Sequence, residues 1–150
     1  MKTLLFKIPP IVTIIILACM WVTAKLLTAF AVVLPLRELL ASILSIAGGI
    51  ISFLGMLSFK LAKTTFNSVR LDSVSSLVVS GIYSVTRNPM YLGLVLVLLG
   101  WCYFLSNILT LAFVPLYVLY INYFQIQPEE KVLESKFGES YLQYKLKVRR

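Results

Sequence analysis

The chain has 150 residues, of which 59% are hydrophobic and 13% are charged, and its mean hydropathy is +0.91. This composition excludes a soluble globular protein and indicates an integral membrane protein that forms one domain over residues 1–150. The formal net charge of +8 does not indicate a nucleic-acid partner, because the basic residues lie at the ends of apolar segments and form no stripe with interleaved aromatic residues.

The first apolar run extends from Ile11 to Leu34, long enough to cross the roughly 30 Å hydrocarbon layer as a helix. Lys2 and Lys7 precede it and Ala29 to Ala31 follow, a pattern that faintly imitates a signal peptide and its cleavage site. Lys25 interrupts that pattern, so we interpret the run as a retained helix. Lys25 lies near one end of the run, a position that predicts a side chain that reaches toward the lipid headgroups.

The second predicted span, Leu39 to Phe59, follows a tight connection over Pro35 to Glu38. Gly48, Ser52 and Gly55 lie on about one face of this helix. A face of small residues is typical of a seam where two membrane helices pack closely, so we assign it no chemistry. We expect this helix to lie in the middle of the bundle.

A long connection from Lys60 to Asn88 separates the second span from the third. It is polar overall, but its middle, Leu77 to Val85, is rich in apolar and aromatic residues, and Gly81 permits a sharp turn before Tyr83. We therefore expect the connection to lie in the membrane interface or to fold back between helices.

Two further runs, Met90 to Leu105 and Ile108 to Ile126, predict a helical hairpin that turns at Ser106 and Asn107, with a kink at Pro115. The first arm covers only about 24 Å, so either it is extended backward or its start is buried within protein. Both alternatives place the polar connection beside the bundle.

Beyond Ile126 the chain becomes charged. A helix is predicted from Pro128, with Glu129 and Glu130 near its positive end, and it is expected to end at Gly138. A second short helix is expected near Glu139. Its apolar side, which would face the membrane surface or the bundle, consists of Tyr141, Leu142, Tyr144 and Val148.

If four helices alternate in direction, most basic residues fall on one side of the membrane, which leaves Arg37 opposite and Lys25 inside the first helix. The positive-inside rule then predicts that both termini are cytoplasmic. The connection that ends at Asn88 and the carboxylates of Glu129 and Glu130 also fall on this cytoplasmic face. The small size of the chain indicates a prokaryotic inner membrane.

The residues that could carry metal or redox chemistry are few. The sequence has no histidine, and Cys19 and Cys102 lie inside apolar runs. We expect both cysteines to be small buried hydrophobic residues, and we expect no metal site and no disulfide.

Tyr83, Asn88, Tyr91, Glu129 and Glu130 together have the chemistry to hold a cationic, amino-acid-like ligand that bears a nucleoside. Carboxylates attract an ammonium or a sulfonium, and aromatic faces favour a cation and stack on a base. Spacing alone does not identify the ligand. The alternative is that the two glutamates only complement a helix dipole on a solvated face.

The run LVVSGIYSVTRNPMYLG, followed after a hairpin by EEKVLESKFGESYLQY, resembles the isoprenylcysteine carboxyl methyltransferase and phospholipid methyltransferase superfamily. These membrane enzymes have a pattern like L-V-x-x-G-x-Y-x-x-x-R-H-P-x-Y-x-G and, downstream, E-E-x-x-L with F-G-x-x-Y-x-x-Y. The resemblance covers about Lys60 to Arg150, and the first two helices match only in being hydrophobic.

The resemblance implies an all-α integral membrane methyltransferase with about four transmembrane helices, a cytoplasmic motif loop and C-terminal cytoplasmic helices. S-adenosylmethionine would be its cofactor, and its partner would be a lipophilic acceptor that enters sideways from the bilayer. The resemblance also implies which residues bind the cofactor. Beside the adenosine would lie Ser76, Leu77, Val78 and Tyr83, and the turn against the cofactor would consist of Asn88, Pro89, Met90 and Tyr91. At the methionine end of the cofactor would lie Glu129, with Glu130 supporting it.

Two positions depart from the pattern. Asn88 stands where the superfamily has a histidine, which keeps a hydrogen-bonding side chain and removes the titrating group. Gln125 stands where enzymes that act on prenylated cysteine have an arginine that helps to hold the acceptor carboxylate. We therefore assign Asn88 to positioning and Gln125 to substrate binding, with a lipophilic carboxylate or a lipid amine as the acceptor.

Two other readings stay open at this point. A sterol-reductase-like enzyme would use NADPH in a related C-terminal core. A small four-helix transporter or scaffold would need no cofactor, but a proton-coupled transporter is expected to carry an ionisable residue near mid-membrane, and apart from Lys25 the predicted spans have none.

Overall fold

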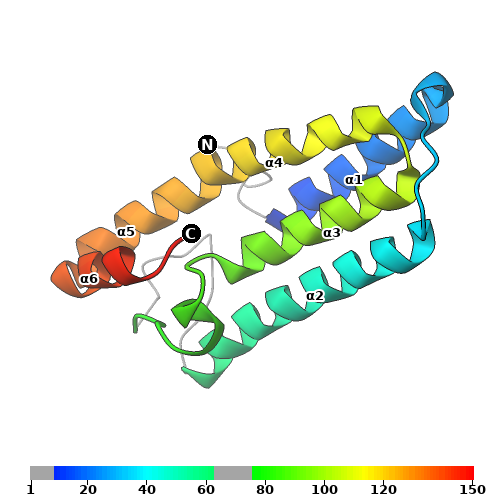
Figure 1. The fold of residues 1–150 in the computed structure, drawn as a ribbon. Coiled ribbons are helices and arrows are strands. Elements are labelled where there is room, and N and C mark those ends of the chain that lie inside the picture. The colour runs from blue at the N-terminus through cyan, green and yellow to red at the C-terminus, as the bar shows by residue number, and fades with distance from the viewer. Residues whose placement is uncertain (1–8, 63–75) are drawn as a thin grey trace.

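The computed structural model describes residues 9–62 and 76–150, and helices make up most of this part of the chain. Within it the β-pairing is limited to an isolated bridge between Ala31 and Asn107. The predicted all-α class is confirmed. The main helices (Figure 1) are α1 (Pro9–Leu26), α2 (Arg37–Leu61), α3 (Pro89–Leu105), α4 (Phe113–Ile121), α5 (Gln127–Phe137) and α6 (Glu139–Lys147).

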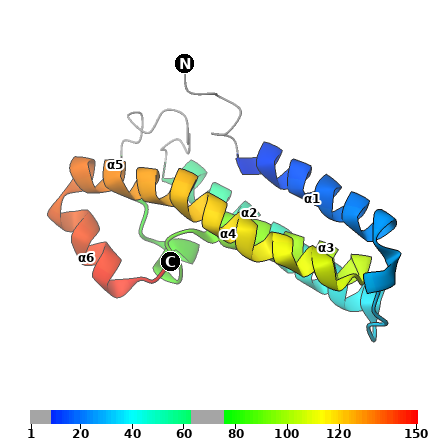
Figure 2. The ribbon, with the colours of Figure 1, turned by 90° about the horizontal axis from the view of Figure 1, so that it is seen from above.

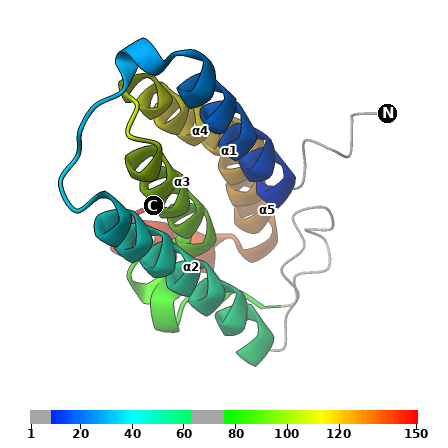
Figure 3. The same ribbon diagram turned by 90° about the vertical axis from the view of Figure 1, so that its right-hand side faces the viewer.

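Among the described residues, three helical segments are long and apolar enough to cross a membrane, namely Pro9–Leu26, Arg37–Leu61 and Ile108–Phe137, and α3 is a shorter apolar helix. Helix α3 contacts α1, α2 and α4, and it lies between α2 on one side and the α1 and α4 pair on the other (Figure 3). The expectation that α2 is the central helix is therefore wrong. The small residues of α2 form a single packing face, and this face packs against α3.

The α2–α3 seam brings the two backbones into direct contact. Gly48 and Gly55 are buried on α2, Gly93 is buried on α3, and the Ser52 hydroxyl donates a hydrogen bond to the carbonyl of Met90 at 3.2 Å. A Cβ atom added at Gly48 would lie 2.5 Å from the backbone oxygen of Gly93. The predicted packing seam is thus the place where α3 is fixed along α2.

Helix α1 is shorter than predicted, since it ends at Leu26. The chain that follows forms a 3₁₀ turn over Thr28–Phe30 and is held to the α3–α4 corner, because the Asn107 side chain donates to the carbonyl of Leu27 at 2.8 Å and the Val32 amide donates to the carbonyl of Ser106 at 2.8 Å. The connection to α2 is therefore longer than the expected turn at Pro35. Lys25 lies in the last turn of α1, as predicted.

The cysteines differ from each other. Cys102 is partly buried, and its sulfur lies 3.2 Å from the Thr110 hydroxyl. Cys19 is exposed on α1, where a transmembrane helix faces lipid, so the prediction that it is buried is wrong. Both thiols are free, and an exposed apolar side chain is stable in this solvent without a protein partner.

Helices α4 and α5 are continuous, joined by a π-helical turn over Asn122–Ile126. The predicted helix is found as α5, which begins one residue earlier, at Gln127, and has Pro128 in its first turn. It does not follow a break, because the π-helical turn leads into it and gives room for the proline ring, which would otherwise clash with the carbonyl four residues earlier. Pro115, where a kink was predicted, lies in the first turn of α4, directly after the 3₁₀ turn Ile108–Ala112.

The segment Ile108–Phe137 measures about 45 Å at 1.5 Å per residue, so it exceeds the hydrocarbon layer and α5 extends beyond it. The chain reverses at Gly138, whose φ is +49°, and α6 turns back toward the 3₁₀ turn η4 (Gly81–Ser84) (Figure 2). Tyr141, Tyr144 and Val148 form a buried cluster on its inner side. Leu142 is 37% exposed and lies outside this cluster, so of the two predicted surroundings the bundle is excluded for it and the membrane surface stays a prediction.

We predict opposite effects for alanine at two adjacent glycines of α2. Gly48→Ala should destabilise the protein by about 1–3 kcal/mol, because the new methyl group meets the backbone of α3. Gly49→Ala should stabilise it by up to about 1 kcal/mol, because nothing lies within 4 Å of the new methyl and alanine favours the helix. Thermal or denaturant unfolding in the same detergent measures both, and equal effects would contradict the seam.

Candidate functional site

The connection before α3 and the α5–α6 pair enclose a cavity at one end of the bundle. Helix α2 contributes Phe59 from its last turns, α3 contributes Tyr91 from its first turn, and α5 contributes Glu129. This is the end at which α2 finishes and α3 begins, as alternating helix directions require (Figure 1). Segments far apart in the sequence therefore meet around one space.

The structure brings together most of the residues that the sequence assigned to the cofactor. Pro89 is buried at the start of α3 and packs toward Gly55 of α2 instead of lining the cavity. Gln125 is 3% exposed within the π-helical turn and is also absent from the lining. The binding roles of all these residues stay predictions. Those that line the cavity are Ser76, Leu77, Val78, Tyr83, Asn88, Met90, Tyr91, Glu129 and Glu130.

Five further lining residues were not assigned from the sequence: Phe59, Arg87, Leu133, Tyr141 and Tyr144. Four of them lie within the two superfamily motifs, so closer attention to those motifs would have found them. Phe59 has no such signal, because it is one of many apolar residues near the end of a transmembrane helix.

The start of α3 and the start of α5 are joined by a hydrogen bond between buried side chains. The Tyr91 hydroxyl donates to Oε1 of Glu129 at 2.6 Å, and these residues are 5% and 9% exposed. Pro89 at the first position of α3 sets this helix start, because its ring needs no amide donor there. Glu129 thereby presents a fixed carboxylate to the cavity.

The neighbouring carboxylate has different surroundings. Glu130 accepts a hydrogen bond from Arg87 Nη1 at 2.9 Å and another from Arg150 Nε at 2.9 Å. Its side chain is only 9% exposed, so the alternative of two glutamates on a solvated face is wrong. Because two guanidinium groups already compensate Glu130, its main effect is to hold three segments together.

Tyrosines form the wall on the side of α6. The Tyr144 hydroxyl donates to the carbonyl of Tyr83 at 2.7 Å, and the Tyr83 ring meets Phe59 edge to face with centroids 5.2 Å apart. Burial and the neighbouring Glu130 raise the pKa of Tyr141 to about 12, and burial with the neighbouring Tyr141 raises the pKa of Tyr144 to about 12. Burial likewise raises the pKa of Tyr83. These hydroxyls stay protonated at neutral pH.

The side-chain amide of Asn88 carries a hydrogen-bond donor that has no acceptor among the described residues. Its Nδ2 is buried, and among residues 9–62 and 76–150 it has no hydrogen-bond partner. Buried donors in folded proteins are nearly always paired, because an unpaired one loses its hydration without compensation. A ligand in the cavity could complete this hydrogen bond with an acceptor atom.

The lining therefore offers a carboxylate on Glu129, a free amide donor on Asn88, and apolar and aromatic walls. Such a set suits a ligand that has a cationic centre, an acceptor atom and a flat or apolar group. It contains no nucleophile with a lowered pKa, so binding and orientation are the chemistry that it supports.

The sequence was then compared with known proteins. The model of the phospholipid methyltransferase family matches residues 36–140, from the end of the first connection into α6. The chain belongs to this family. It is a membrane methyltransferase, and the superfamily resemblance is confirmed. The match also includes α2, which the motifs alone did not cover.

An uncharacterized protein of Haemophilus influenzae is 54% identical to the chain over 61 residues. Those residues are 41% of this chain and 97% of that protein. No solved structure matches the chain.

Replacement of one buried carboxylate should show how much the site depends on its ion pairs. Glu130→Gln should lower the free energy of unfolding by about 3 kcal/mol, because Arg87 and Arg150 lose their counter-charge in a mostly buried place. Glu134→Gln removes a single pair with Lys145, whose side chains are 45% and 32% exposed, and should cost less than about 1 kcal/mol. Denaturant unfolding of both variants tests this, and similar losses would refute it.

Proposed function

We propose that this membrane methyltransferase uses S-adenosylmethionine as its methyl donor and methylates the amine of a membrane lipid. The observation that carries the proposal is the buried pair of Tyr91 and Glu129 beside the unpaired Asn88 amide, in a cavity with aromatic walls. Membership of the phospholipid methyltransferase family supports both the reaction and the lipid acceptor.

The lining residues fit this cofactor. Glu129 would compensate the positive charge at the methionine end, and Asn88 Nδ2 would donate to an acceptor atom of the cofactor. Leu77, Val78 and Tyr83 would form the apolar and aromatic surface for the adenosine. When bound, S-adenosylmethionine would supply an electrophilic methyl group on a sulfonium.

A lipid amine suits the site better than a carboxylate. Glu129 presents negative charge to the cavity, which repels a second carboxylate, and Gln125 has no positive charge to compensate one. The new bond forms from the nitrogen lone pair to the methyl carbon as the carbon–sulfur bond breaks, and the sulfur keeps that electron pair. The proton of the amine would leave to water, because the tyrosines of the wall stay protonated.

Positioning would supply most of the rate enhancement, because transfer from a sulfonium needs an in-line approach more than it needs acid or base catalysis. The acceptor's hydrocarbon tail would stay in the bilayer and reach the site between α3 and the α4–α5 helix. The tyrosine wall and α6 would keep bulk water from the opposite side.

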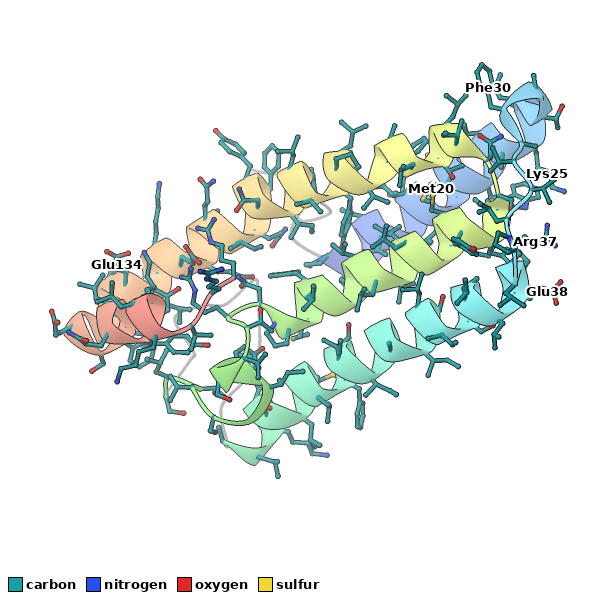
Figure 4. The ribbon with its side chains drawn as sticks, in the orientation of Figure 1. Met20, Lys25, Phe30, Arg37, Glu38 and Glu134 are labelled. Atoms are coloured by element: carbon teal, nitrogen blue, oxygen red, sulfur yellow. The ribbon has the colours of Figure 1, made fainter. Side chains whose placement is uncertain are left out.

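We further propose that the cavity faces the cytoplasm, and that the membrane is a bacterial inner membrane, as the relative in Haemophilus influenzae supports. Figure 4 shows Lys25, Arg37 and Glu38 at the far end of the bundle from Glu134. Eight described basic residues lie at the cavity end, against two at the other, which supports a cytoplasmic cavity by the positive-inside rule. Those eight are Lys60, Arg87, Lys131, Lys136, Lys145, Lys147, Arg149 and Arg150.

The first test is calorimetric titration of the detergent-purified protein with S-adenosylhomocysteine. The wild type should bind it, and Glu129→Gln should weaken binding by at least about tenfold, because a charge-assisted contact is lost. Glu139→Gln, a change of the same chemistry on the exposed first turn of α6, should leave the affinity unchanged. Absence of binding by the wild type, or binding of NADPH in its place, would refute the proposed cofactor.

The acceptor is tested with labelled S-adenosylmethionine and vesicles of defined lipids. Methyl transfer should occur with phosphatidylethanolamine vesicles and not with phosphatidylglycerol vesicles, which lack an amine. Transfer to a prenylated cysteine carboxylate instead would contradict the lipid amine as acceptor and retain the cofactor.

Asn88 gives a separate prediction. Asn88→Ala should weaken binding of S-adenosylhomocysteine by about tenfold, the expected effect of losing one buried hydrogen bond. Ser84→Ala, an exposed site in the same connection whose hydroxyl donates to the carbonyl of Gly81, is the control and should leave binding unchanged. Equal affinities of the wild type and Asn88→Ala would show that this donor does not face the cofactor.

A further inference from the structure

Arg150 bridges two places on the continuous α4–α5 helix, one on each side of most of its π-helical turn. Its guanidinium contacts both carboxylate oxygens of Glu130, which follows the turn and lines the cavity, from Nε at 2.9 Å and from Nη2. Its third nitrogen, Nη1, donates to Oδ1 of Asn122, the first residue of the turn, at 3.0 Å. All three nitrogens of one side chain are therefore engaged with this helix, two with a residue of the cavity lining and one with the π-helical turn.

The two partners of Arg150 belong to different functional surfaces. Glu130 lines the cavity, and Arg87, which binds the same carboxylate, lines it too. Asn122 is the first residue of the π-helical turn, in which Tyr123 and Phe124 are 66% and 53% exposed. Arg150 thus spans from the cavity wall to the helix surface along which a lipid would approach.

The neighbouring Arg149 provides a natural comparison. Its carbonyl accepts a hydrogen bond from the Arg87 amide at 2.9 Å, so it contributes backbone to the same junction. Both residues are exposed, the Arg150 side chain by 43%, but in Arg150 all three guanidinium nitrogens donate hydrogen bonds to the α4–α5 helix. Two adjacent residues of the same charge therefore differ in whether the guanidinium takes part.

We propose that Arg150 is a positioning residue for methyl transfer, which holds the cofactor wall and the lipid-facing π-helical turn in one fixed relation. The proposal rests on the proposed function and adds to it a residue that neither superfamily motif includes. Lysine cannot replace it fully, because only the planar guanidinium serves the two oxygens of Glu130 and the Asn122 oxygen at once.

A π-helical turn is an element for which such a link matters. Its hydrogen bonds run from residue i to residue i+5 instead of i+4, and such turns occur mostly as single-turn bulges inside α-helices, frequently at functional sites. The hydrogen bond from Arg150 to Oδ1 of Asn122 holds the first residue of this turn. Because the same guanidinium is paired with Glu130, loosening of the cavity wall would also release the turn.

The test compares Arg150→Ala with Arg149→Ala in the detergent-purified chain. Arg150→Ala should raise the calorimetric Kd for S-adenosylhomocysteine by about five- to tenfold, as for loss of a partly exposed charge-assisted pair, and Arg149→Ala by less than about twofold. Arg150→Lys should fall between them and serves in its place if Arg150→Ala does not fold. Equal Kd values for the variants at 150 and for Arg149→Ala would overturn the proposal.

Asn122→Ala separates positioning from simple stabilisation of the cavity. It should leave the Kd for S-adenosylhomocysteine within about twofold and raise the KM for phosphatidylethanolamine vesicles by about threefold or more at saturating S-adenosylmethionine. An unchanged KM would overturn the link to the lipid side. Failure of the wild type to bind S-adenosylhomocysteine would instead refute the proposed function, so the two failures are distinct.

Discussion

Burial of the Glu130 carboxylate at the edge of the membrane is the constraint on which the site depends. A charge in that place is stable only if cations reach it, and here they come from the connection before α3 and from the segment after α6. The requirement draws three separate segments to one point. The cavity is the space that remains between them, so its walls are fixed by electrostatics as much as by apolar contact.

The adjacent Glu129 shows how a helix gives two neighbouring carboxylates different tasks. Successive residues of an α-helix point about 100° apart, so Glu130 meets the arginines while Glu129 meets Tyr91 and the cavity. Glu130 is held by the two arginines, whereas Glu129 is hydrogen-bonded to Tyr91, and both line the cavity.

The sequence predicted the four apolar segments, the helix stop at Gly138 and most lining residues, because apolar runs and motifs are local signals. The sequence did not predict the features that depend on contacts between residues far apart in the chain. Helix α1 ends early because Asn107 and Ser106 bind the chain beyond it, and α4 continues through Pro128 because a π-helical turn accommodates the ring. No pattern near Phe59 or Arg150 indicates that either belongs to the site.

The short length of α3 has a consequence for the membrane itself. Its 17 residues measure about 26 Å, less than the hydrocarbon layer, and its first residue, Pro89, is buried beneath the cavity. A helix shorter than the bilayer is accommodated by local thinning or by a dip of the lipid surface. The start of α3, where the cavity lies, is therefore expected at or below the level of the lipid headgroups.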